Sequence, residues 1–158
     1  SCESPRHGTR AIVDIDVFPL HATASGLCAL AFGPKYLMEA GLADLTSFTQ
    51  KTATTPQMLR GTVQAIRQTG FGGARHTYEA EVVGLSTPLF DQTGQFAGAV
   101  SVASVATRFT PALEHLIKEH LMIASRDITR NWGGFIPSDI EGLWVKTFTS
   151  SRALESTS

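Results

Sequence analysis

Cysteine is scarce in this sequence. The 158 residues include two cysteines, Cys2 close to the N-terminus and Cys28 within the apolar stretch 27–32 (LCALAF). Small secreted domains that cannot build a sufficient core depend on several disulfides, and two cysteines in such different surroundings do not make a disulfide framework. We therefore expect reduced thiols and a cytoplasmic location.

Long hydrophobic runs and an excess of basic charge are also missing. No apolar run approaches the roughly 20 residues that a helix needs to cross a bilayer, and the first ten residues, SCESPRHGTR, lack the pattern of a secretion signal. Lys and Arg total 13 against 14 Asp and Glu, so the formal net charge is -1. A domain that binds DNA by neutralising phosphates needs a cationic surplus. We expect a soluble chain that contacts neither a membrane nor, by itself, DNA.

Metal and cofactor motifs are absent as well. The five histidines show no metal-ligand spacing, since even His115 and His120 lie five residues apart and so on different sides of a helix. The glycines at positions 70, 72 and 73 lack the G-x-G-x-x-G pattern and a preceding strand. The sequence predicts neither a metal site nor a cofactor.

Catalysis has little support. Ser25 lies in the tripeptide ASG rather than in the G-x-S-x-G elbow of a hydrolase, and we interpret Cys28 as a small core residue. His21 could act as a base toward Ser25, but no third group that would orient it is evident. A small hydrolase built on His21 and Ser25 remains an alternative, although we do not expect an enzyme.

Helix start and stop signals are clear, and at this length one domain can build its own core. Three of the expected helices follow a threonine that can cap the first turn, and two of these threonines precede a proline. The expected helices cover residues 24–32, 35–40 with Gly41 as terminator, 56–69 with Gly70 as terminator, and 111 to about 132.

Alternating and β-branched residues predict strands at 10–18, around 76–79, at 82–90 and at 95–105. The last two form a hairpin around the turn 91–94 (DQTG). Helices and antiparallel strands alternate without the rhythm of a parallel sheet, which indicates an α+β domain.

The hairpin predicts which residues share a face. Closing it directly around its turn pairs Gly84 with Ser101 and Val83 with Val102. The Val83 face is bulky and suits packing under helices, whereas the Gly84 face carries mainly Gly, Ala and Ser. Such a face either packs closely against another backbone or leaves a cavity for a ligand. The small residues at 23–26 would open a helix whose free amides suit a carboxylate.

Four segments, in this order, carry a family resemblance: PLHATASGLCALAF, TPQMLRGTVQAIRQTGF, YEAEVVGLSTPLFDQTGQFAGAVSVASVATRFT and a long helix that ends in ITRNWG. Together they resemble the C-terminal domain of the IclR family of transcriptional regulators over about residues 17–133. The resemblance implies a GAF-like antiparallel sheet flanked by helices. We expect a tail at 1–9, this domain at 10–133, and an extension at 134–158 that is disordered from about residue 150.

The resemblance also implies a function. Such a domain binds a small organic effector, for example a carboxylate or an aromatic compound, and thereby modulates operator binding by an N-terminal winged helix-turn-helix domain that this sequence lacks. DNA would then be contacted through that missing domain alone. The family leads us to expect a homodimer or homotetramer. A free-standing GAF-like sensor or interaction module remains the alternative.

The resemblance implies site residues too. In the family, backbone groups of the loop that matches Thr23, Ala24 and Gly26 hold the ligand, and the facing sheet positions match Gly84 and Ser101. Residues 74–77 (ARHT) replace an acidic stretch that is frequent in the family, position 84 is often Cys, and position 103 often Ser. The candidate ligand-binding residues are Thr23, Ala24, Ser25, Gly26, Phe71, Arg75, Gly84, Ser86, Ser101 and Ala103.

Arg75 is the most informative of these departures. A guanidinium binds a carboxylate through two parallel hydrogen bonds, so its presence would suit a more anionic ligand. The alternative is that Arg75 is a solvated loop residue.

Overall fold

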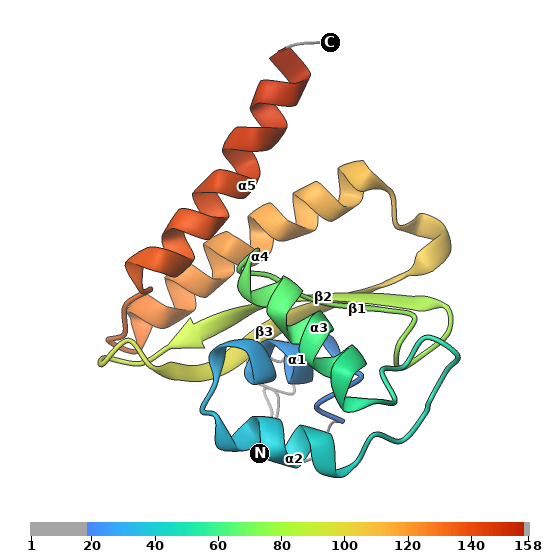
Figure 1. Cartoon of the computed structure of the whole chain (residues 1–158). Coiled ribbons are helices and arrows are strands. Elements are labelled where there is room, and N and C mark those ends of the chain that lie inside the picture. The colour runs from blue at the N-terminus through green and yellow to red at the C-terminus, as the bar shows by residue number, and fades with distance from the viewer. Residues whose placement is uncertain (1–18, 157–158) are drawn as a thin grey trace, which may run out of the picture.

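The computed structural model describes residues 19–156, with side-chain surroundings for residues 19–150. A three-stranded antiparallel sheet in the order β1-β2-β3 lies between helices: α1, α2 and α3 cover one face and α4 covers the other (Figure 1). This is the α+β fold that the sequence predicted. The elements are α1 (Ala24–Phe32), α2 (Tyr36–Ala43), α3 (Pro56–Arg67), β1 (Gly72–Arg75), β2 (Val82–Phe90), β3 (Phe96–Val105), the 3-10 turn η1 (Ala106–Arg108), α4 (Pro111–Asn131) and α5 (Ser138–Ser156).

Threonine caps begin three of the helices, as predicted. The side chains of Thr23, Thr55 and Thr110 each accept a hydrogen bond from a backbone N–H in the first turn of α1, α3 and α4. Each cap satisfies an amide that the helix itself leaves unpaired and contributes about 1 kcal/mol. The predicted starts of these helices are therefore confirmed.

Other expectations differ from the structure. α2 continues past Gly41 to Ala43, because the missing side chain of Gly41 lets α2 approach Leu30 of α1 closely. Residues 76–79, predicted as a strand, form a turn after β1. The turn follows from the backbone of His76, which adopts a left-handed φ of 63°. The predicted strand at 10–18 lies outside the described residues.

The pairing of β2 with β3 corrects the predicted register. Gly84 lies opposite Ala103 rather than opposite Ser101. A bulge between Leu89 and Phe90 shifts the register beside the turn. The shift amounts to two residues along β3, and side chains in a strand alternate with a period of two, so both faces keep the composition that the sequence predicted.

The bulky face of the hairpin lies under α4. Val83 pairs with Ser104 instead of Val102 and is 3% exposed. On the same face the hydroxyl of Thr87 donates a 3.1 Å hydrogen bond to the carbonyl of Leu121 in α4. Val102, which pairs with Leu85, is 42% exposed.

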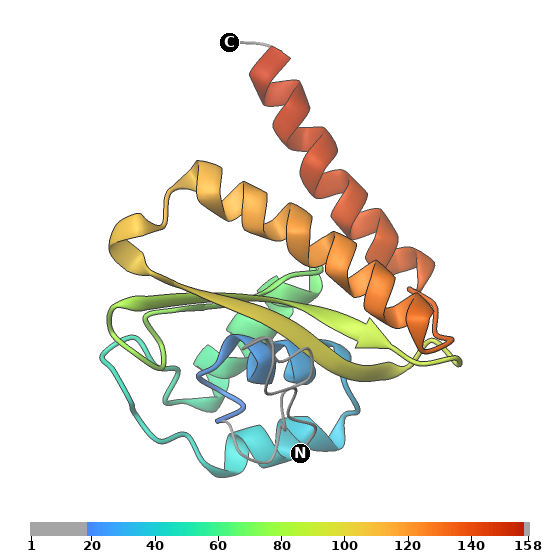
Figure 2. The same cartoon turned by 180° about the vertical axis from the view of Figure 1, so that it is seen from behind.

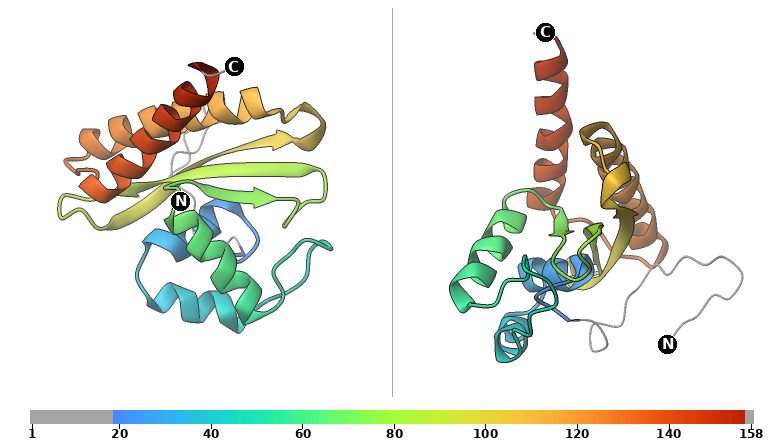
Figure 3. Two further views of the ribbon diagram at one scale, coloured as in Figure 1. Left: turned by 45° about the horizontal axis from the view of Figure 1, so that its top comes forward. Right: turned by 90° about the vertical axis from the view of Figure 1, so that its right-hand side faces the viewer.

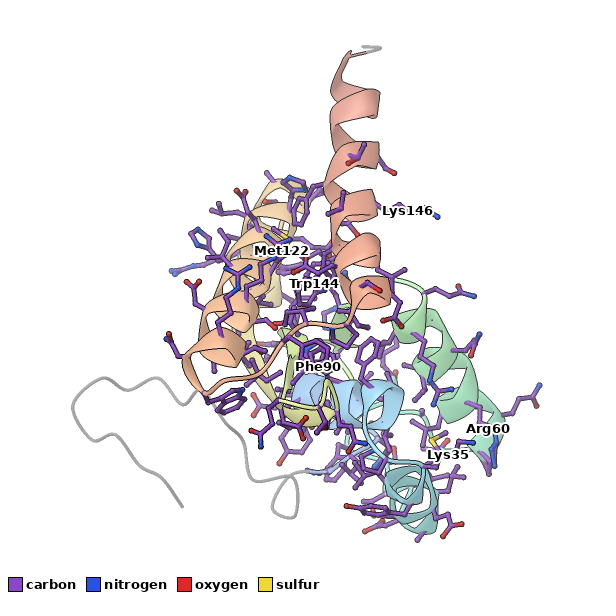
Figure 4. All side chains as sticks on the ribbon, turned by 90° about the vertical axis from the view of Figure 1, so that its left-hand side faces the viewer. Lys35, Arg60, Phe90, Met122, Trp144 and Lys146 are labelled. Carbon is purple, nitrogen blue, oxygen red and sulfur yellow. The ribbon has the colours of Figure 1, made fainter. Side chains whose placement is uncertain are left out.

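Helix α5 was not predicted, since residues 138–156 were assigned to the extension, with disorder expected from about residue 150. It continues to Ser156 and points away from the body of the domain at its C-terminal end (Figures 2 and 3). Its first half packs against α4 and the sheet through Ile140 and Trp144, which form a second apolar cluster with Phe71 and Phe90. Figure 4 shows Trp144, Met122 and Phe90 gathered between these elements. In the described part of the chain, no helix is long and apolar enough to span a bilayer.

Candidate ligand-binding site

The N-terminus of α1 supplies hydrogen-bond donors. Thr23 caps the helix, accepting from the Gly26 amide at 3.1 Å and donating its hydroxyl to the Pro19 carbonyl at 2.9 Å. Among the described residues, no acceptor binds the amides of Ala24 and Ser25. Two backbone amides at a helix N-terminus, with the positive end of the helix dipole behind them, suit an anionic group.

A cavity of about 340 Å³ adjoins these amides. It separates the start of α1 from the small-residue face of β2 and β3, and the turn before β2 forms part of its wall. Its size lies at the small end of the range for ligand pockets. The residues that line it are Thr23, Ala24, Ser25, Ala74, Tyr78, Glu79, Val82, Gly84, Ser101, Val102 and Ala103.

The small-residue face of the hairpin packs closely against another backbone in one part and lines a cavity in another, so both of the alternatives that the sequence left open occur. Towards β1, α1 packs directly on the sheet: the Ser86 hydroxyl donates to the Ala24 carbonyl at 2.7 Å. A side chain at Gly72 would collide with Ser86, and one at Gly84 would place its Cβ 3.1 Å from that of Ala24. Towards β3, around Ser101, the face lines the cavity. Small residues therefore allow close contact with α1 at one end of the face, at Gly72 and Gly84, and leave space at the other end, at Ser101 and Ala103.

The structure brings together six of the ten predicted site residues. Thr23, Ala24, Ser25, Gly84, Ser101 and Ala103 all line this cavity. Their role in binding stays a prediction.

The other four lie outside the cavity wall. Gly26 is buried beneath Leu20, and Ser86 is covered by α1. Phe71 belongs to the cluster around Trp144. Arg75 forms an ion pair with Glu114 of α4. An arginine on a strand alternates with its neighbours, so Arg75 faces away from the cavity that Ala74 lines.

Sequence reasoning missed Tyr78 and Glu79. Both line the cavity from the turn between β1 and β2. The Thr77 hydroxyl donates to the Ala22 carbonyl at 2.6 Å, which joins the turn to the start of α1. The Tyr78 ring meets Phe48 edge-on at 5.0 Å. The available signal was an aromatic residue next to an acid just before a strand, but the sequence pattern predicted a strand at 76–79 instead of a turn.

The geometry gives no support to the hydrolase alternative. The Nε2 atom of buried His21 lies 2.7 Å from the Thr46 carbonyl oxygen, so this nitrogen is engaged away from Ser25. Burial raises the pKa of the Cys28 thiol to about 12, although a hydrogen bond with Ser86 partly opposes the shift. A thiol this weakly acidic is a poor nucleophile. Among the described residues, no group of three or more His, Cys, Asp or Glu could hold a metal.

The described residues thus form an α+β domain with a cavity between the start of α1 and β3. The family model described as "Bacterial transcriptional regulator IclR C-terminal" matches residues 10–130. The chain therefore belongs to the IclR family, of which it contains the C-terminal domain.

Relatives agree with this assignment. The chain is 29% identical over 116 residues to the HTH-type transcriptional regulator KipR of Bacillus subtilis, covering 70% of this chain and 46% of KipR. It is 30% identical over 122 residues to the Pca regulon regulatory protein of Pseudomonas putida, covering 73% of this chain and 42% of that protein. The chain thus spans less than half the length of these two relatives.

Solved structures show the same fold. A crystal structure of an IclR transcriptional regulator from Silicibacter matches with a TM-score of 0.71 and 33% identity, over 77% of this chain and 48% of that one. The Thermotoga maritima IclR structure matches with a TM-score of 0.66 and 29% identity, over 72% and 47%. Both shares leave part of this chain and about half of the neighbour unmatched.

Proposed function

We propose that this domain senses a small organic monocarboxylate in the cavity between α1 and β3. The observation that carries the proposal is that the Ala24 and Ser25 amides, which have no acceptor among the described residues, line the same cavity as the Ser101 strand. The amides offer donors for the carboxylate, and the hydroxyl of Ser101 offers a donor or acceptor from the opposite wall.

The rest of the wall restricts the ligand. Val82 and Ala103, which lie on the same face of the hairpin as Gly84, present apolar surface to the cavity, and such a wall suits a hydrocarbon or aromatic body. Glu79 also lines it. A second carboxylate on the ligand would lie near this exposed acid, and two like charges repel each other. A monocarboxylate therefore fits better than a dicarboxylate.

In a regulator that combines this domain with a DNA-binding domain, effector binding would change operator affinity through that DNA-binding domain and through assembly into homodimers or homotetramers. A ligand can do this only if it binds two conformations of the protein with different affinity. The turn that carries Tyr78 and Glu79 is a suitable segment to change conformation when a ligand binds. It lines the cavity and is hydrogen-bonded, through Thr77, to the start of α1.

A thermal-shift screen tests this function. Small monocarboxylates, each paired with its neutral amide analogue, are added to the purified chain, and a ligand that binds the folded state raises its melting temperature. We expect hits among the acids that the variant Ser101→Leu no longer binds, because leucine fills the cavity. Ser104→Leu is the matched control, since position 104 lies on the same strand but the opposite face. Equal stabilisation of the Ser101→Leu variant would exclude this cavity.

A further inference from the structure

A second cavity, of about 380 Å³, lies at the other edge of the sheet. It is bounded by α3, by the outer edge of β1 and by α4, and it shares no wall residue with the first cavity. Part of its wall is apolar and comes from Ile66, Phe71 and Leu85. Arg75, which the sequence singled out as an anion-binding candidate, faces this space together with Lys118.

The two cations are not equivalent. The Arg75 guanidinium pairs with Glu114 and lies over the Phe109 ring at 5.3 Å, so its charge is compensated. The Lys118 ammonium lies 5.4 Å from the centre of the Phe71 ring. Among the described residues, no carboxylate or carbonyl accepts a hydrogen bond from Lys118. Burial, followed by the nearby charge of Arg75, holds the pKa of Lys118 below its ordinary value. The wall therefore carries one cation without a counter-charge.

The backbone of β1 adds donors to the same wall. The His76 amide donates to the Val82 carbonyl on β2 at 3.1 Å. Backbone groups of alternate residues in a strand point to opposite sides, so the amides of Gly73 and Arg75 point away from β2, to the outer edge of the described sheet. Gly73 has no side chain that would cover its amide. Neither amide has a partner among the described residues, and an edge strand of this kind beside an uncompensated cation is a favourable place for an anion.

We propose that this second cavity binds a small carboxylate with an apolar body, held by Lys118 and the Gly73 amide. One uncompensated positive charge matches one carboxylate, and the apolar wall matches a hydrocarbon or aromatic ring. Arg75, paired with Glu114, forms part of the wall of the site. The site is independent of the effector cavity and would give the domain a second input.

Nuclear magnetic resonance tests the proposal on the full chain with benzoate as the probe and neutral benzamide as its comparison. Benzoate should shift the backbone amide signals of Gly73 and Arg75, whereas benzamide at the same concentration should not. The variant Lys118→Met keeps the length of the side chain without its charge. Its dissociation constant for these shifts should rise about tenfold or more, because a hydrogen bond to a charged group is lost.

Two controls separate this site from the first. Lys146→Met removes a lysine that points to solvent from α5 (Figure 4) and should leave the benzoate shifts unchanged. Ser101→Leu should also leave the Gly73 shift in place. Benzoate shifts confined to Ala24 and Ser25, an absence of any shift at Gly73, or an equal response to benzamide would each overturn the proposal. If Lys118→Met fails to fold, benzoate binding to the parent chain still tests the proposal. The shift of the Gly73 amide signal must weaken with added sodium chloride if the contact is ionic.

Discussion

The hydroxyl of Ser86 donates a 2.7 Å hydrogen bond to the carbonyl of Ala24 and so joins the centre of the sheet to the first turn of α1. Ser86 is fully buried. The bond sets the distance between the helix amides and the sheet, and with it the width of the candidate effector cavity.

Removing the Ser86 hydroxyl should therefore destabilise the domain. In Ser86→Ala the Ala24 carbonyl is left buried without its partner, and such a loss costs about 1–3 kcal/mol. Urea unfolding at neutral pH measures the change. Ser104→Ala, on the opposite face of the neighbouring strand, should change the free energy of unfolding by less than about 0.5 kcal/mol. Equal effects at both positions would show that the Ser86 bond has no special role.

Cys28 should make stability depend on pH in the alkaline range. Burial raises the pKa of its thiol from 9.0 to about 12 in the folded chain. Above pH 9 the unfolded chain loses this proton while the folded chain keeps it, so stability falls as the pH rises from about 9 to about 12. At pH 10 the loss is about 1.4 kcal/mol. Urea unfolding of the parent and of Cys28→Ala at pH 8 and pH 10 isolates this contribution, because other groups titrate equally in both. Parallel pH dependences would contradict the prediction.

The attachment of α5 should rest on packing rather than on charge. Trp144 is fully buried and its indole N–H donates to the Gly70 carbonyl at 2.8 Å. Trp144→Ala should cost about 3–5 kcal/mol. Arg126 pairs with both carboxylate oxygens of Glu141 at 2.8 and 2.6 Å, but the pair is partly exposed, so Glu141→Gln should cost about 1 kcal/mol or less. Chemical denaturation ranks the two variants, and the reverse order would be inconsistent with this packing.

His76 should tolerate asparagine better than valine. Its φ of 63° lies in the left-handed region, which asparagine enters readily and a β-branched residue does not. Both variants lose the imidazole contact, in which Nδ1 lies 2.6 Å from the Ala80 carbonyl oxygen. We expect His76→Val to be less stable than His76→Asn by about 1–2 kcal/mol, measured by thermal and urea unfolding. If the two melt alike, the turn does not keep this backbone conformation.

The sequence was sufficient where local rules decide the structure. Threonine caps located three helix starts, and the alternation of small and bulky residues predicted both faces of the hairpin. It failed where tertiary contacts decide: a bulge beside Phe90 moved the register, and packing of α2 against α1 carried a helix through Gly41.

For the candidate site, too, some residues could be predicted from the sequence and others could not. The small residues at 23–25, 84, 101 and 103 predicted either close packing or a cavity, because they cannot fill space, and in the structure they line a cavity. Which side of β1 Arg75 faces depends on the exact strand position, and the sequence placed that strand four residues too late. Tyr78 and Glu79 were missed for the same reason, since a turn, and not a strand, carries them to the cavity.

The most direct test of the account is a crystal structure of this chain with the monocarboxylate that stabilises it most in the thermal-shift screen. We predict that the carboxylate oxygens lie about 3 Å from the amide nitrogens of Ala24 and Ser25, with the apolar body of the ligand between α1 and the Ser101 strand. A carboxylate bound elsewhere, with these two amides facing only solvent, would contradict the assignment of this cavity as the effector site.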